Sequence, residues 1–348
     1  MAQGSDLSSY KNNGSTVRIS TGGTSNTISA FKNAGSDIKG SSYSDSYANY
    51  MKRAFDSDKF KINGNPIDIC KLGYRPRTVG ANMIHLGPGT YTMTCAADGS
   101  KTCNGIQMSP ANTDVGFRDA FFIFGVGGGG SGGTGNSAHS GAGGGGGCAF
   151  DAVLTFNGST GANVAFVVGS GGASENGDGD NDGHGGGDTM IFFQNSSGNT
   201  MSDVYVGGGS GGGSDGGGGG AGGTLSTYNN PTEVRTDRAY LAYLTSVAGG
   251  KGGNAGAYGG NVSWTMYTCS PETGINQSYS GGKPGGSSNN RGGGGGASGF
   301  HDGGYGTTYE NDSQAGTYGS GSGGTGYRVI GNIGNSGKGG DGFIEMDY

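Results

Sequence analysis

Apolar residues in this chain form short runs separated by polar or glycine-rich stretches. The clearest runs early in the chain are Val79–Leu86, Thr90–Ala96 and Asp119–Phe124. They are rich in β-branched and aromatic residues, and short runs of this kind between turn residues are typical of β-strands. Further strands are expected at Cys148–Phe156, Ala162–Val168, Thr189–Gln194, Val204–Val206, Val262–Thr268, Gly326–Ile330 and Gly342–Tyr348. The pattern predicts a mainly β protein, built as an antiparallel β-sandwich.

The order of apolar and polar positions within two runs indicates where their strands lie. Cys148–Phe156 alternates in part, as expected of a strand with one buried face. Phe121–Phe124 does not alternate, so both of its faces should be covered. We therefore expect Phe121–Phe124 to be a central strand.

Two stretches have a helical pattern instead. Apolar residues recur near the helical period between residues 43 and 60, which predicts one short N-terminal helix. Val234–Ser246 also looks helical. We divide the chain into an extended polar arm at 1–42, a helix and linker at 43–76 that form an attachment region, and a glycine-rich β domain at 77–348.

Glycine changes this picture, because 86 of the 348 residues are glycine and only 14 of them precede Gly125. A collagen helix is excluded, since there is no Gly-X-Y repeat and only 7 prolines. Uniform disorder conflicts with the aromatic runs between the tracts. The tracts, such as Gly143–Gly147 and Gly292–Gly296, fit two structures, and the sequence leaves both open: packed, extended polyglycine II-type helices with three residues per turn, or surface loops.

Charge and cysteine content limit the classes of function. The net charge is −6 and no Lys/Arg-rich stretch occurs, so a nucleic-acid partner is not expected. No apolar run approaches the roughly 20 residues of a membrane span, and Met1–Ser9 has no signal-peptide pattern, so we expect assembly in the cytoplasm and no membrane partner. Five scattered cysteines favour reduced thiols, although a hairpin disulfide between Cys95 and Cys103 is conceivable.

The order of strands and glycine tracts resembles a known family. Phe121–Gly130, the tract ending at Gly147, the turn and strand at Ala162–Gly172, the Gly185–Phe192 strand and the closing Gly337–Tyr348 resemble the glycine-rich domain of phage tail and tail-fibre proteins, including receptor-binding fibre-tip adhesins. The resemblance covers about residues 119–348. It implies a virion protein, exposed on the particle, whose loops contact the host surface.

Two sets of residues carry candidate chemistry. Asp178, Asp180 and Asp182 open a DxDxDG calcium loop, but its closing Glu is replaced by Thr189, so a solvated acidic loop is the favoured alternative. The four histidines have no catalytic or metal-binding spacing, so we expect no enzyme activity and no cofactor apart from calcium.

Aromatic residues gather among Asn, Ser and Gly between residues 255 and 330, a composition also typical of antibody binding sites. The candidates for receptor binding are Tyr258, Tyr279, His301, Tyr305, Tyr309 and Tyr318.

We therefore expect a phage tail-fibre or tail-tip protein that binds a host surface protein or glycan and joins other virion proteins through residues 1–76. A homotrimer is left open. The alternative is a purely structural virion protein, such as a head fibre, capsid decoration or baseplate component.

Overall fold

The computed structural model describes residues 61–62, 65–66, 83–96, 100–103, 106–108, 120–136, 138–156, 161–177, 179–233, 238–266, 275–285, 291–308, 311–327 and 334–347. Every regular element in these ranges is a β-strand, and the paired strands are antiparallel. The expectation of a mainly β fold with antiparallel sheets is confirmed. The N-terminal helix expected within 43–60, and the arm at 1–42, lie outside the described residues.

The larger sheet has seven strands, and two pairs of its neighbouring strands are joined through glycine-rich connections, at residues 169–188 and 207–224. Its order is β12 (Leu225–Tyr228), β11 (Thr200–Val206), β10 (Thr189–Gln194), β9 (Asn163–Val168), β4 (Gly89–Cys95), β5 (Lys101–Cys103) and β6 (Ile106–Met108). In β9 the burial alternates residue by residue, with Val164, Phe166 and Val168 on the buried face. This face is directed toward the second sheet.

The second sheet has five strands, in the order β13 (Tyr240–Val247), β8 (Ala149–Thr155), β7 (Ala120–Val126), β16 (Phe343–Asp347) and β3 (Met83–Leu86). One apolar cluster contains Phe121 and Leu154 from this sheet together with Phe166 and Ile191 from the larger one. The two sheets therefore pack against each other. β7 is the middle strand and is covered on both faces, since Phe121 and Phe124 belong to different clusters, as the sequence predicted.

Two small sheets complete the strands. β14 (Val262–Met266) pairs with β15 (Ile275–Tyr279), and Met266 and Trp264 pack on the face of the five-stranded sheet that points away from the main core. β1 (Lys61–Ile62) pairs with β2 (Asn65–Pro66).

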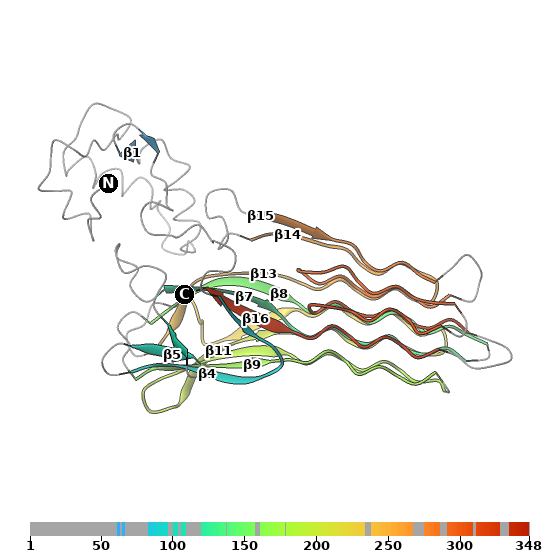
Figure 1. Cartoon of the computed structure of the whole chain (residues 1–348), viewed down its shortest axis with the longest axis horizontal. Helices are drawn as coiled ribbons and strands as arrows, with labels where there is room; N and C mark the ends of the chain where they lie inside the picture. Colours follow the sequence, from blue (N-terminus) through green and yellow to red (C-terminus); the bar gives the residue numbers. More distant parts are fainter. Residues whose placement is uncertain are drawn as a thin grey trace, which may run out of the picture.

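Long glycine segments continue from the strands. In Figure 1 strands of both sheets run on into extended segments that lie side by side and reach one end of the molecule, where the chain turns back. Residues 127–135 follow β7, for example, and residues 139–147 return to β8. We call this set of segments the glycine bundle and its far end the distal end.

Backbone hydrogen bonds in the glycine bundle repeat every third residue. Successive N–H groups of residues 141–147 donate to three different neighbouring segments in turn, so every third residue bonds the same segment. The pairs, neighbour by neighbour, are Gly141 to Thr325, Gly144 to Ser322 and Gly147 to Gly319; Ala142 to Gly213 and Gly145 to Ser210; and Gly143 to Gly253 and Gly146 to Gly250, at 2.7–2.9 Å. A strand repeats every two residues, whereas an extended polyproline II-type helix repeats every three. The tract thus bonds in three directions, not in one plane.

The absence of a side chain permits this packing. A Cβ added to Gly145 would overlap the carbonyl oxygen of Ala221, and one added to Gly146 would overlap that of Ala297. Neither glycine has a positive φ. Glycine is therefore required here for close approach of neighbouring backbones and not for its conformational freedom.

Buried hydroxyl groups replace backbone bonds where serine or threonine enters the bundle. The Ser322 hydroxyl accepts the Gly132 N–H at 2.8 Å and donates to the Gly337 carbonyl at 2.5 Å. The Ser313 hydroxyl accepts from Gly337 N and donates to Gly323 O in the same way. Both serines are buried, so each hydroxyl links two segments that would otherwise leave buried polar groups unsatisfied.

One predicted helix is wrong. The described part of Val234–Ser246 contains β13, which pairs with β8 and buries Tyr240, Leu241 and Tyr243. A register shift between Leu241 and Tyr243 interrupts the alternation that identifies a strand, which explains why the sequence looked helical. The strand expected at Gly326–Ile330 is not seen at residues 326–327, and the rest of it lies outside the described residues.

Candidate binding surfaces

An aromatic cluster lies where the five-stranded sheet meets the glycine bundle. The Phe343 ring on β16 is its centre, in edge-to-face contact with Phe300, Tyr318 and Phe124 at centroid distances of 5.1, 5.7 and 6.2 Å. His85 on β3 stacks on Phe343 at 5.6 Å. Phe343 and Phe124 are buried, whereas Tyr318 is exposed. Edge-to-face pairs of this kind fix the orientation of the rings in addition to burying apolar surface. The exposed Tyr318 ring is therefore supported by the buried Phe343 ring beneath it.

Two turns hold the exposed side of this cluster. The buried Ser298 hydroxyl donates to the Tyr318 carbonyl at 2.7 Å and accepts the His301 N–H at 3.1 Å, which ties the 298–301 turn to the 317–320 turn. Tyr318 has φ 46° and Gly319 has φ 75°. A bulky residue with positive φ is unusual, and such strained backbone persists only where its surroundings impose it. The turn thus fixes the backbone from which the Tyr318 side chain projects.

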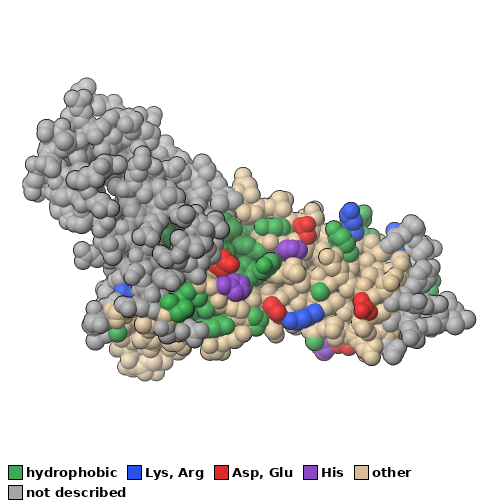
Figure 2. All heavy atoms as spheres, in the orientation of Figure 1, with side chains coloured by type: hydrophobic (Ala, Val, Ile, Leu, Met, Phe, Trp, Pro, Cys, Tyr) green, Lys and Arg blue, Asp and Glu red, His purple; other side chains and the backbone are tan. Residues whose placement is uncertain are grey.

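A row of exposed side chains, with the half-buried His301 among them, extends from Tyr318 along the glycine bundle. The His301 and Tyr318 rings are 6.0 Å apart, and Asp302 follows His301. Tyr305 is three residues further, and its N–H and carbonyl bond the Gln314 side chain and N–H at 3.1 and 3.0 Å. We call His301, Asp302, Tyr305, Gln314 and Tyr318 the tyrosine strip. Figure 2 shows hydrophobic side chains gathered on one face of the molecule, with His and acidic side chains nearby.

The predicted receptor-binding residues fall in different places. Tyr258, Tyr305 and Tyr318 are 66%, 47% and 55% exposed, and they are three of the five exposed large hydrophobic side chains in the described part of the chain. The structure brings His301, Tyr305 and Tyr318 into one strip, whereas Tyr258 lies near the 254–257 turn of the bundle. Tyr309 lies outside the described residues.

Tyr279 differs from the other candidates because it is half-buried at the end of β15. Its hydroxyl donates to the Gln277 side chain at 3.0 Å. Burial, and then the nearby Asp302 carboxylate, raise the pKa of Tyr279. Its hydroxyl is thus engaged within the fold, and the ring is a supporting residue beside the strip.

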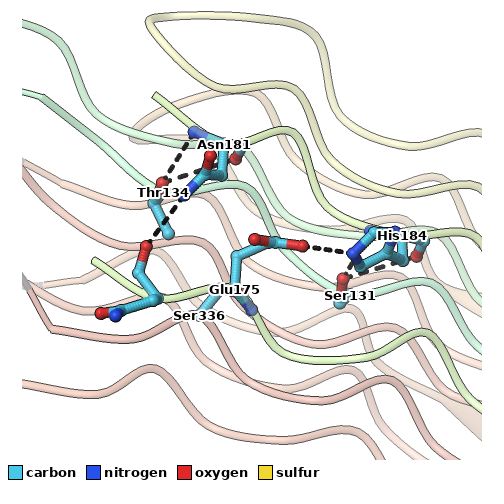
Figure 3. Close-up of polar contacts among 7 residues, drawn as sticks. Ser131, Thr134, Glu175, Asn181, His184 and Ser336 are labelled. Carbon is cyan, nitrogen blue, oxygen red and sulfur yellow. Dashed lines mark hydrogen bonds and ion pairs between the residues drawn. The ribbon is translucent and has the colours of Figure 1, made fainter. Parts of the chain in front are cut away.

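The distal end of the bundle forms a second polar surface in which side chains join separate turns. Asp215 accepts from Asn136 Nδ2 at 2.7 Å and contacts His139 Nδ1 at 2.5 Å. Figure 3 shows how neighbouring segments are joined beneath the turns: the Thr134 hydroxyl meets the Asn181 backbone, and Glu175 forms an ion pair with His184. The distal turns are thereby held relative to one another.

The predicted calcium loop has carboxylates that are used in this network. Asp182 accepts the Ser214 N–H at 2.7 Å, and this bond holds the pKa of Asp182 below its usual range. Asp188 accepts the Gly208 N–H, and Asp180 is exposed. The Thr189 hydroxyl, at the position of the missing Glu, donates to the Val126 carbonyl. Asp178 lies outside the described residues. Calcium binding stays a prediction, and the Asp182 carboxylate, one of its expected ligands, accepts the Ser214 N–H in this structure.

Other chemistry in the described part is limited. No three His, Cys, Asp or Glu side chains of the described residues converge as metal ligands. Cys95, Cys103 and Cys148 are buried and form no disulfide bond, and burial raises the pKa of Cys103 to about 11 and that of Cys148 to about 12. Cys95 and Cys103 do not face each other in the β4–β5 pair, because their register partners are Lys101 and Met93. The hairpin disulfide between Cys95 and Cys103 is therefore not formed.

Sequence reasoning missed the residues that support the strip. Phe343 looked like an ordinary strand residue, and Ser298 was one serine among many. Their contacts join positions far apart in the chain, and only the closing strand pattern at Gly342–Tyr348 pointed to Phe343 as a buried ring.

Comparison with known proteins adds no relative. No protein-family model matches the chain, and no curated protein matches it in sequence. In the described part, no helix is long and apolar enough to span a bilayer.

Proposed function

We propose that this chain is a virion appendage protein of a bacteriophage, at a tail fibre or tail tip, that binds the host cell surface through its glycine-rich β domain. The observation that carries the proposal is the exposure of Tyr258, Tyr305 and Tyr318 on a densely bonded glycine bundle. Exposed tyrosines on a rigid support give contact area at low entropic cost on binding. The resemblance to fibre-tip adhesins supports the same reading.

The bundle suits this role because its surfaces do not need to fold on binding. Tyr318 rests on Phe343, and the Tyr305 backbone is held by a reciprocal pair of bonds with Gln314. Under the proposal, residues 1–76 join the other virion proteins, the binding surface points away from the particle, and no reaction is catalysed.

Adsorption of particles tests this proposal. Particles carrying the Tyr258→Ala, Tyr305→Ala and Tyr318→Ala substitutions together should adsorb to host cells at least tenfold more slowly than the parent. The reason is that aromatic anchors dominate binding energy, and each tenfold loss corresponds to about 1.4 kcal/mol.

The matched control is Tyr228→Ala, since Tyr228 is 61% exposed but belongs to the edge strand β12 of the larger sheet. Its adsorption should equal the parent's. Unchanged adsorption of the triple variant on intact particles would reject receptor binding and favour a purely structural virion protein.

A further inference from the structure

Each polar side chain of the tyrosine strip bonds the protein through one polar atom and has a second polar atom that bonds none of the described residues. Asp302 Oδ1 accepts the Ser280 N–H at 2.6 Å, and Gln314 Oε1 accepts the Tyr305 N–H at 3.1 Å. His301 Nδ1 contacts the Asp302 carbonyl at 3.0 Å. The second carboxylate oxygen, the amide NH₂ and His301 Nε2 have no protein partner among the described residues. The strip therefore offers an acceptor and a donor whose positions are already set.

The spacing of residues along the tyrosine strip keeps its aromatic rings apart. Asp302 and Tyr305 are three residues apart on a segment with a three-residue repeat, so they project on one side about 9 Å apart at roughly 3.1 Å per residue. Tyr318 and His301 lie at the sheet end of the same strip. Aromatic faces thus alternate with hydrogen-bonding groups.

This alternation fits one class of ligand. A sugar ring presents C–H groups on its faces, which pack on aromatic rings, and hydroxyl groups at its edge, which bond to carboxylates, amides and imidazoles. A protein partner would instead bury a contiguous apolar centre. The strip lacks one, because the exposed Asp302 side chain lies between His301 and Tyr305 along the chain, and the exposed Gln314 side chain bonds the Tyr305 backbone. The strip contains one carboxylate and no Lys or Arg, so it does not favour an anionic polymer.

We propose that the tyrosine strip binds an uncharged polysaccharide of the host cell surface, with Tyr318 and Tyr305 stacking on sugar rings and Asp302 and Gln314 bonding their hydroxyls. This inference rests on the proposed function, because it names the ligand class for the same surface.

The test uses the purified full chain, fluorescently labelled, and host cells in three forms: untreated, oxidised with periodate, which cleaves sugars with adjacent hydroxyls, and digested with proteinase K. Periodate should lower binding at least tenfold and proteinase K should not. Polysaccharide extracted from the same cells should compete with binding.

Two variants connect the result to the strip. Tyr318→Ala should lower affinity at least tenfold, whereas Tyr318→Phe keeps the ring and should bind within threefold of the parent. Both should show the parent's thermal unfolding, and Tyr228→Ala should bind as the parent does.

Two outcomes would overturn the inference in different ways. Binding that survives periodate and is lost after proteinase K would mean a protein receptor, which leaves the proposed function standing. Failure to bind untreated cells at all would overturn the proposed function and the inference together.

Discussion

At the scale of single residues, the glycine bundle depends on missing Cβ atoms. Gly145 lies between neighbouring segments whose carbonyl oxygens occupy the space of a side chain, although its φ is one that any residue can adopt. Gly218 belongs to the same bundle but has nothing within 4 Å of the Cβ position. Substitutions at these two positions therefore distinguish the effect of close packing on stability from the effect of glycine content.

Gly145→Ala should lower the free energy of unfolding by about 2 kcal/mol or more, because an added methyl group in a closely packed interior forces the backbones apart. Gly218→Ala should be neutral or stabilising by about 0.4–1 kcal/mol, since it only restricts the unfolded chain. Urea unfolding of both variants measures the difference. Equal stability of the two variants would show that the segments are not packed as described.

At the scale of elements, the strands were largely predictable because burial in a sheet leaves a local pattern. Thr189–Gln194 was predicted at its observed bounds, and Phe121–Phe124 was placed correctly as a central strand. β5, β12 and β15 were missed, since they are short or polar and are strands only because a neighbour pairs with them. Tertiary pairing of this kind has no local signal.

The candidate site was predictable only in part. The composition around Tyr305 and Tyr318 marked them as exposed aromatic residues, and both are exposed. Their grouping with His301 depends on Ser298 and Phe343, which contact residues distant in sequence. The sequence left helices with three residues per turn and surface loops both open around Asp302 and Tyr305, because glycine tracts have no side chains to reveal which face is buried.

Hydrogen exchange tests the period of three directly. The amides of Gly144 and Gly145 donate to neighbouring segments, whereas those of Gly185, Gly211 and Gly218 have no acceptor among the described residues. The first group should exchange at least a hundredfold more slowly than the second, because exchange requires opening of the bonded structure. NMR of the exchanging protein resolves the two groups. Random-coil rates throughout would indicate surface loops instead of a bundle.

At the scale of the whole molecule, sheets and bundle form one elongated body (Figure 1). Glycine segments continue from strands of both sheets, and Tyr318 rests on Phe343 at the point where sheet and bundle meet. A receptor-binding surface at this junction depends on the rigid bundle that carries it and does not involve the distal turns. The proposed function therefore predicts that the chain is displayed at a free end of the particle, where this side of the body can reach a cell.

Electron microscopy of particles labelled with gold-conjugated antibody against residues 77–348 measures that placement most directly. The account predicts gold at the free end of a tail or tail fibre, with no label on particles that lack the chain. Label confined to the capsid shell, or no label on intact particles, would contradict a receptor-binding appendage.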